Sequence, residues 1–291
     1  MEKFYVNQET ELLKYMQEVF SDKSRSAVKK MLQHGQFIVG GKPVTQFNYP
    51  LKKDQVVYVL SQKESKQIDY LESVSVIYED RDLLAIEKES GLLSVPSENA
   101  APDEDSAYIQ VMGYVQSVDS RGEVFSVHRL DRNTSGVMLF AKNKRAEKIL
   151  QDRWSELVLK RSYTAVVEGC DFPEEKGTHT SYIKELDNYQ VISSPDDNGG
   201  KFAETKYKKI KSNDLYSLVE AELVTGRRNQ IRLHMKDMGH PISGDSKYGA
   251  ASNPLNRLAL HAVSLEIIHP ISQEELIFES KVPNSFINLV K

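Results

Sequence analysis

Residues 127–141 read VHRLDRNTSGVMLFA, a polar segment that leads directly into five apolar residues. The apolar run from Val137 to Ala141 predicts a buried strand, because a short uninterrupted apolar segment suits the interior of a sheet. The loop before it places Asp131 between Arg129 and Arg132, so the carboxylate could be held rigidly beside a nucleic-acid backbone. An aspartate considered alone is more often a turn or capping residue. The chemistry of this loop therefore depends on the rest of the pattern.

Strand and helix patterns alternate irregularly on both sides of this segment. Further runs with β-branched and aromatic residues predict strands at Val74–Tyr78, Leu83–Ile86, Tyr163–Gly169, Phe202–Ile210 and Leu215–Val224. Apolar residues at helical spacing predict helices over Lys144–Leu157 and Asn229–Met238. Because strands adjoin in sequence, we expect an α+β fold with a central mixed or antiparallel sheet flanked by helices, not a regular βαβ series.

The N-terminal part has a different pattern. An amphipathic helix over Leu12–Phe20 is followed by a second helix, which begins near Ser24 or Ser26 and ends at Gly35. Short strands are predicted at Phe37–Val39 and Val56–Leu60. The arrangement over residues 9–62 resembles the ribosomal-protein-four type of RNA-binding module. We therefore predict an RNA-binding module at 1–62, a linker at 63–72 and a catalytic domain at 73–291, with a flexible acidic loop at Ser97–Asp105.

Charge is distributed unevenly along the chain. The net charge is −4, yet residues 1–62 carry nine Lys or Arg against six Asp or Glu. Seven basic residues and no acidic one lie between Lys23 and Lys53. The second predicted helix presents Arg25, Lys29 and Lys30 on one face. A solvated face is the simpler explanation, but a stretch without acids in an acidic protein favours contact with a polyanion such as RNA.

The sequence lacks the motifs of several classes of protein. The opening residues contain no apolar signal segment, and no run approaches the roughly 20 apolar residues of a membrane span. The single cysteine, Cys170, can form neither an internal disulfide nor a metal cluster. Phosphate-cradling glycine loops, zinc-ligand spacings and nucleophile elbows are also missing. We therefore expect a cytoplasmic protein without metal or cofactor, with no membrane association and no obligatory protein partner.

The string His128-Arg129-Leu130-Asp131, followed after two residues by Thr134-Ser135-Gly136, resembles the catalytic motif of the RluA-type RNA pseudouridine synthases. Three further segments resemble motifs of this family in the required order. They are residues 77–96, from Ile77 to Pro96; Arg161–Gly169; and Thr225–His234 with Gly239–Asp245. The segments Leu258–Ala262 and His269-Pro270 also agree, so the resemblance covers nearly all of 73–291. It implies an isomerase that converts uridine to pseudouridine within RNA.

The resemblance assigns roles to three catalytic residues. Asp131 is the essential carboxylate, and Arg232 is its ion-pair partner. Tyr163 is the ring that stacks on the uracil, and its hydroxyl could assist the final proton removal. Helical spacing places Arg228, Arg232 and Lys236 on a cationic stripe beside Ile231, Met235 and Met238. His128, His234 and His261 are interpreted as structural.

Other cations are assigned to RNA. Arg129 is expected to occupy the space left by the flipped base, and the predicted RNA contacts are Arg129, Arg25, Lys29, Lys30, Arg161, Arg227 and Arg228. Two departures from the family pattern have no assigned role: Glu89 stands where proline is common, and Arg228-Asn229 where Thr-His is frequent.

Two alternatives stay open at this point. A catalytically silent RNA-binding protein or chaperone would show erosion at Asp131, Tyr163 or Arg232, and all three are intact. A nucleoside hydrolase would need a second carboxylate at the scissile bond, and none lies in these motifs. The resemblance to family members with this N-terminal module implies large-subunit ribosomal RNA as the substrate, and transfer RNA stays open.

Overall fold

The computed structural model describes residues 2–33, 35–40, 42–61, 70–96, 105–172, 174–197 and 199–291. The chain divides into two compact units, Met1–Glu72 with Gln110–Glu123, and Ser73–Ile109 with Val124–Lys291. Most of the predicted linker at 63–72 and of the loop at Ser97–Asp105 lies outside the described residues. The predicted domain boundaries therefore stay predictions.

The part of the first unit up to Glu72 contains two helices and short antiparallel strands. Helix α1 spans Leu12–Val19 and α2 spans Arg25–Gln33. The strands are β1 (Glu2–Tyr5), β2 (Thr10–Glu11), β3 (Phe37–Val39), β4 (Lys42–Pro43), β5 (Pro50–Leu51) and β6 (Val56–Val59). Four of them form a sheet in the order β1-β6-β3-β4, and β2 pairs with β5. The predicted helices and the two predicted strands are confirmed. Strands β1, β2, β4 and β5 were not predicted, because segments of two to four residues carry too short a pattern.

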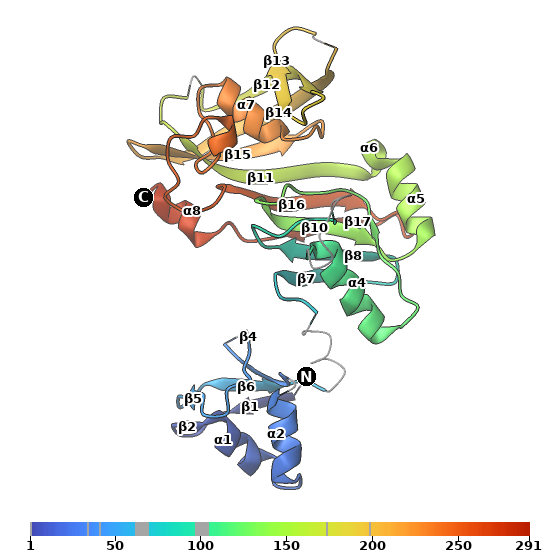
Figure 1. The fold of residues 1–291 in the computed structure, drawn as a ribbon, viewed down its shortest axis with the longest axis vertical. Helices are drawn as coiled ribbons and strands as arrows, with labels where there is room; N and C mark the ends of the chain where they lie inside the picture. The colour runs from blue at the N-terminus through green and yellow to red at the C-terminus, as the bar shows by residue number, and fades with distance from the viewer. Residues whose placement is uncertain are drawn as a thin grey trace. The chain divides into compact units, whose positions relative to one another are not determined.

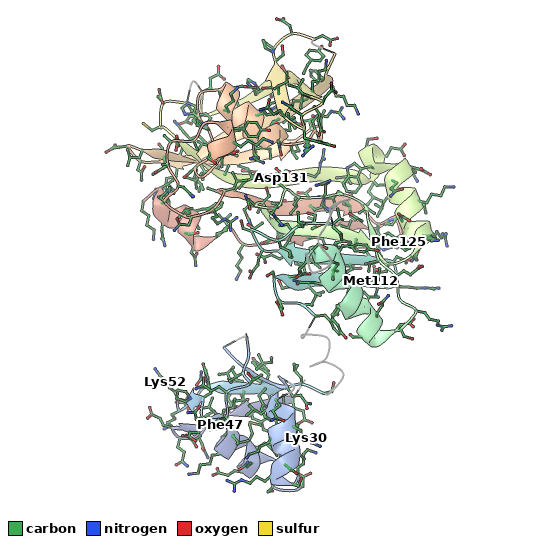
Figure 2. All side chains as sticks on the ribbon, in the orientation of Figure 1. Lys30, Phe47, Lys52, Met112, Phe125 and Asp131 are labelled. Carbon is green, nitrogen blue, oxygen red and sulfur yellow. The ribbon has the colours of Figure 1, made fainter. Side chains whose placement is uncertain are left out.

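Local capping explains the second helix. The Ser24 hydroxyl accepts a hydrogen bond from the Ala27 N–H at 3.2 Å, which satisfies one of the free donors of the first turn. Gly35 has φ +63°, the left-handed conformation that commonly ends a helix. Val28 and Leu32 are buried, while Arg25, Lys29 and Lys30 are exposed, as predicted. Lys30 is labelled on this helix in Figure 2.

The second unit is formed around one large sheet. Its strands run in the order β13-β12-β14-β15-β11-β16-β10-β8-β7, with β17 paired to β16 and β9 to β10. Their bounds are β7 (Val74–Glu79), β8 (Leu83–Lys88), β9 (Phe125–Ser126), β10 (Ser135–Ala141), β11 (Val158–Glu168), β12 (Lys176–Glu185), β13 (Val191–Ser194), β14 (Lys201–Ser212), β15 (Tyr216–Leu223), β16 (Leu260–Ile268) and β17 (Glu275–Glu279). Strands β10 and β16 pair in parallel and their other neighbours are antiparallel, so the predicted mixed sheet is confirmed.

Helices cover this sheet at separate places (Figure 1). They are α5 (Lys144–Asp152), α6 (Trp154–Leu157), α7 (Gln230–Asp237) and α8 (Asn284–Leu289), with a short 3₁₀ turn η1 at Ser246–Tyr248. Helix α4 (Ala107–Val118) carries residues of both units. Helix α7 packs against β12, β13 and β14, whereas α5 packs against β9 and β10.

Two helix predictions need correction. The helix predicted over Lys144–Leu157 is two helices, because the backbone leaves helical geometry at Arg153 (φ −123°, ψ 28°). The helix predicted from Asn229 begins at Gln230, because Asn229 has φ +57°, which is left-handed. Arg228 therefore lies before the helix, and the predicted stripe with Arg232 and Lys236 does not form.

Candidate active site

Asp131 lies in the loop that joins β9 to β10, and Figure 2 labels it near the middle of the large sheet. The loop folds back on itself, since the Thr134 N–H donates to the Asp131 carbonyl at 3.0 Å. The Asp131 side chain is 30% exposed, so it is accessible to a ligand without being freely solvated.

The segment 88–94 clamps this loop from one side. The Ser94 hydroxyl donates to the Leu130 carbonyl at 2.7 Å and accepts from the Leu130 N–H at 3.0 Å. The Lys88 ammonium is fully buried and donates to the carbonyls of Glu89, Leu92 and Arg132. Burial lowers the pKa of Lys88 to about 7, while the three carbonyls match the three N–H groups of its protonated form. The residues on both sides of Asp131 are thus fixed by hydrogen bonds.

The Thr-Ser-Gly part of the motif attaches the same loop to β16. Ser135 hydrogen-bonds with His261 at 2.8 Å and accepts from Arg257 at 2.7 Å. Gly136 has φ +111°, and a β-carbon there would lie 2.1 Å from the Ala262 carbonyl oxygen. Only glycine permits this approach, which explains why the parallel pairing of β10 with β16 begins here.

A cavity of about 310 Å³ opens beside the loop, and all three predicted catalytic residues line it. This volume is at the lower end of the usual range for ligand pockets. Asp131 comes from the loop, Tyr163 from β11 and Arg232 from α7, so the sheet brings together residues about one hundred positions apart.

The predicted ion pair is present. Arg232 Nη1 lies 3.2 Å from Asp131 Oδ2. The same guanidinium also donates to both carboxylate oxygens of Asp245, from Nε at 2.7 Å and from Nη2 at 2.8 Å. Burial alone would lower the pKa of Arg232, but the bonds and charge of Asp245, followed by those of Asp131, outweigh it and raise this pKa. Arg232 is therefore a permanent cation shared by two carboxylates.

Tyr163 is partly buried and packs against the main core. The register between β11 and β16 shifts between Ser162 and Tyr163, and such irregularities commonly re-aim a side chain. Burial raises the pKa of Tyr163 to about 12. The phenol is therefore neutral near pH 7, which suits a stacking ring better than a proton acceptor.

The predicted RNA-contacting arginines of this unit divide into two groups. Arg129 is exposed at the cavity, and Arg161 and Arg227 line it. Arg161 donates to the carbonyls of Leu223 and Val224, whereas Arg227 Nε donates to the carbonyl of Phe202. Arg228 lies outside this cavity and pairs with Glu185 at the surface.

The structural interpretation of the histidines agrees with their contacts. His128 Nε2 accepts from the Leu139 N–H at 2.9 Å, and burial lowers the pKa of His128 to about 4. His234 is fully buried between Ser181 and Thr205, and its pKa is also lowered to about 4 by burial. His261 has the bond to Ser135 described above and one to Ser280.

Four functional positions had no role assigned from sequence. Lys88 and Ser94 hold the loop, and Asp245 and Tyr248 hold Arg232. Lys88, Ser94 and Asp245 lie inside segments that resemble family motifs, but their partners are distant in sequence. A motif shows that a residue type is required without showing what it contacts.

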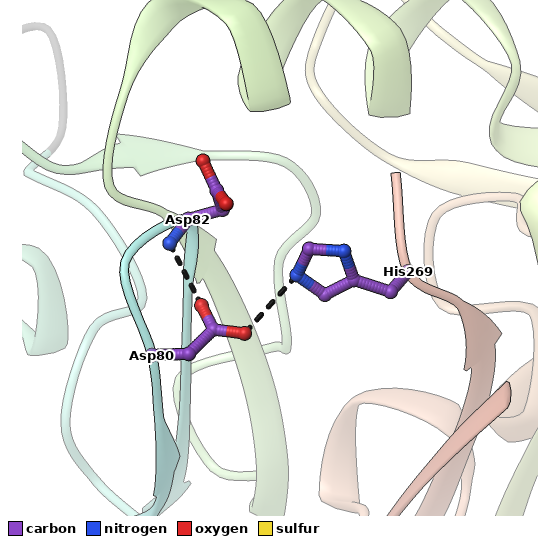
Figure 3. A group of neighbouring side chains, drawn as sticks. All are labelled: Asp80, Asp82 and His269. Carbon is purple, nitrogen blue, oxygen red and sulfur yellow. Dashed lines mark hydrogen bonds and ion pairs between the residues drawn. The ribbon is translucent and has the colours of Figure 1, made fainter. Parts of the chain in front are cut away.

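Among the described residues, one cluster has the composition of a metal site: Asp80, Asp82 and His269 (Figure 3). Its atoms are already engaged. Asp80 Oδ2 accepts from His269 Nε2 at 3.1 Å and from the Tyr78 hydroxyl at 2.7 Å, while its Oδ1 accepts two backbone N–H groups. His269 Nδ1 accepts from two backbone N–H groups of the following turn, so Nε2 carries the proton. The hydrogen bonds of this cluster connect the turn after β7 to the segment after β16.

Comparison with known proteins defines the class to which this fold and site belong. Residues 82–237 match the family model described as RNA pseudouridylate synthase, and residues 12–57 match that of the S4 domain. Two human solved structures share the fold. Human RNA Pseudouridylate Synthase Domain Containing 4 has a TM-score of 0.59 and 22% identity, and the match covers 78% of this chain and 94% of that chain. Human RNA Pseudouridylate Synthase Domain Containing 1 has a TM-score of 0.57 and 24% identity, and the match covers 72% of this chain and 84% of that chain.

Curated relatives extend over most of the chain. An uncharacterized RNA pseudouridine synthase of Bacillus subtilis, YhcT, is 34% identical and covers 92% of this chain and 88% of its own. Ribosomal large subunit pseudouridine synthase C of Rickettsia bellii is 31% identical over 94% of both chains. The chain belongs to the RNA pseudouridine synthase family, whose members isomerise uridine to pseudouridine in RNA. No helix in the described part of the chain has the length and apolar character that crossing a membrane requires.

Proposed function

We propose that this enzyme modifies specific uridines of large-subunit ribosomal RNA in the cytoplasm, with Asp131 as the essential carboxylate. The observation that carries the assignment is the Asp131–Arg232 pair at 3.2 Å, in a cavity that Tyr163 also lines. Two relatives named as ribosomal large subunit pseudouridine synthases, 29% and 31% identical, support this choice of RNA.

The chemistry requires a carboxylate at the ribose while the glycosidic bond breaks, the base turns and a ring carbon rejoins the sugar. Asp131 would provide the carboxylate, and the hydrogen bonds of Lys88 and Ser94 fix the backbone on both sides of it. Arg232 pairs with this side chain at 3.2 Å and would orient it, since a partly buried carboxylate without a partner would be costly.

The target nucleotide has to leave its helix or stack to enter the cavity. Unstacking costs a few kcal/mol, and stacking of a base on an aromatic ring contributes about 1–3 kcal/mol. Tyr163 would offset much of this cost. Arg129, which is exposed and lines the cavity, would fill the space that the base leaves.

The first unit would add affinity without sequence readout. Arg25, Lys29 and Lys30 form an exposed basic face on α2, which suits contact with phosphates. Such contacts position an RNA and leave the choice of uridine to the catalytic unit.

The test compares pseudouridine maps of total RNA from cells with and without the gene. We expect one or a few ribosomal sites to disappear with the gene and to return with the wild type. Asp131→Asn should bind RNA with unchanged affinity and restore no site, whereas the exposed control Asp152→Asn should restore all of them. Turnover by Asp131→Asn would remove the proposed role of this carboxylate. If every pseudouridine site is still present in cells without the gene, the result would instead favour a silent RNA-binding protein.

A further inference from the structure

Arg232 is bound more closely by Asp245 than by Asp131. Two short bonds, 2.7 and 2.8 Å, join its Nε and Nη2 to the two oxygens of Asp245, while one bond of 3.2 Å joins Nη1 to Asp131. The Asp245 side chain is 1% exposed, against 30% for Asp131. A bidentate pair between a guanidinium and a carboxylate fixes the plane of both groups. The orientation of Arg232 is therefore set from the buried side.

Two more side chains complete the attachment. The Tyr248 ring lies against the guanidinium in a cation–π contact, with its centroid 4.8 Å from Arg232 Cζ. Asn229 Oδ1 accepts from Arg232 Nη1 at 3.2 Å, and Asn229 Nδ2 donates to the Tyr248 hydroxyl at 2.7 Å. Asn229 thus links the edge of the arginine to the ring beneath it.

The backbone explains why an asparagine suits position 229. Its φ of +57° is left-handed, a conformation that asparagine tolerates better than most residues. This turn places the amide three residues before Arg232, at the start of α7. The amide supplies an acceptor for the arginine and a donor for the tyrosine at the same time. The departure from the family pattern at Asn229 therefore has a structural role in this chain.

The order of these bonds has a consequence for Asp131. If Asp131 were the only carboxylate at Arg232, moving it towards a ribose would leave a buried cation unpaired, which is strongly unfavourable. With Asp245 in place, Arg232 stays paired when Asp131 changes its contacts. Asp131 can then exchange its arginine bond for a substrate bond without any movement of Arg232.

We propose that Asp245 is a positioning residue, which together with Asn229 and Tyr248 holds Arg232 fixed so that Asp131 is free to engage the ribose. The proposal rests on the function proposed above. It assigns to Asp245 an effect on the rate of the reaction and not on the binding of RNA, because Asp245 is buried behind the arginine.

The experiment uses single-turnover kinetics with the full chain in excess over total RNA from cells lacking the gene. The plateau rate of pseudouridine formation reports the reaction, and the enzyme concentration at half of that rate reports binding. Asp245→Asn keeps the shape and removes the charge, so we expect the plateau rate to fall by about 100-fold, as for a small misplacement of a reacting group. The half-saturating concentration should stay unchanged. The control Asp152→Asn removes an exposed carboxylate at the end of α5 and should alter neither quantity.

A milder variant covers the case in which Asp245→Asn does not fold. Asn229→Gly keeps the left-handed turn and removes only the amide, so the plateau rate should fall by about two- to tenfold, the equivalent of one hydrogen bond. Wild-type plateau rates in both folded variants would overturn the proposal. So would a change confined to the half-saturating concentration, because it would make the cluster part of the RNA contact. The absence of pseudouridine with the wild type would instead refute the proposed function itself.

Discussion

Replacing Ser94 by alanine tests whether the clamp on the catalytic loop controls the reaction. The Ser94 hydroxyl is buried and bonds both backbone groups of Leu130, the residue before Asp131. Alanine fits the same space but leaves a buried N–H and a buried carbonyl unpaired, at about 1–3 kcal/mol each. We therefore expect the free energy of unfolding to fall by about 2–6 kcal/mol. In a chain of this size each kcal/mol corresponds to a decrease in melting temperature of roughly 2–4 °C.

The rate should fall as well, because Asp131 loses the support of its neighbour. We expect about a tenfold or larger decrease in the rate of pseudouridine formation at a temperature where the variant is folded, since productive geometry tolerates little displacement. The control is Ser217→Ala, which removes a buried bond to the Gly169 carbonyl; neither residue lines the cavity of Asp131. This control should lower the melting temperature and leave the rate unchanged. A folded Ser94→Ala variant with the wild-type rate would show that the clamp does not position Asp131.

Three further predictions concern separate parts of the molecule. Tyr163→Phe should retain the wild-type rate, because the raised pKa of Tyr163 keeps its hydroxyl protonated. Tyr163→Ala should weaken binding of the target by about 1–3 kcal/mol, the contribution of stacking. A large loss of rate in the phenylalanine variant would show that the hydroxyl takes part in the reaction. For the basic face of α2, the triple alanine variant of Arg25, Lys29 and Lys30 should reduce the slope of log affinity against log salt by about 2–3, and an unchanged slope would exclude this face as an RNA contact. Burial lowers the pKa of His234 and His261 to about 4 from 6.5, so the unfolded chain binds more protons between these pH values. Stability should then be complete above pH 6.5 and fall progressively towards pH 4, and thermal melts that do not change over this range would contradict the burial argument.

The sequence determined much of the local structure, because local hydrogen bonding and apolar spacing are encoded within a few residues. Neighbouring residues predicted a second helix that begins near Ser24 or Ser26 and ends at Gly35, and a buried strand from Val137 to Ala141. The structure confirms both and selects Ser24 as the cap. The prediction of Asp131 as the catalytic residue rests on the whole motif, because an aspartate alone is not specific.

The tertiary structure decided the contacts that join distant segments. The clamp of Lys88 and Ser94 on the loop, the close approach of Gly136 to Ala262, and the pairing of Arg232 with Asp245 have no local signal. Each depends on which strands become neighbours, since side chains far apart in the chain meet only after the sheet order is set. The sequence by itself therefore predicted which residues would carry the chemistry, and the packing of the sheet and α7 decided how those residues are held.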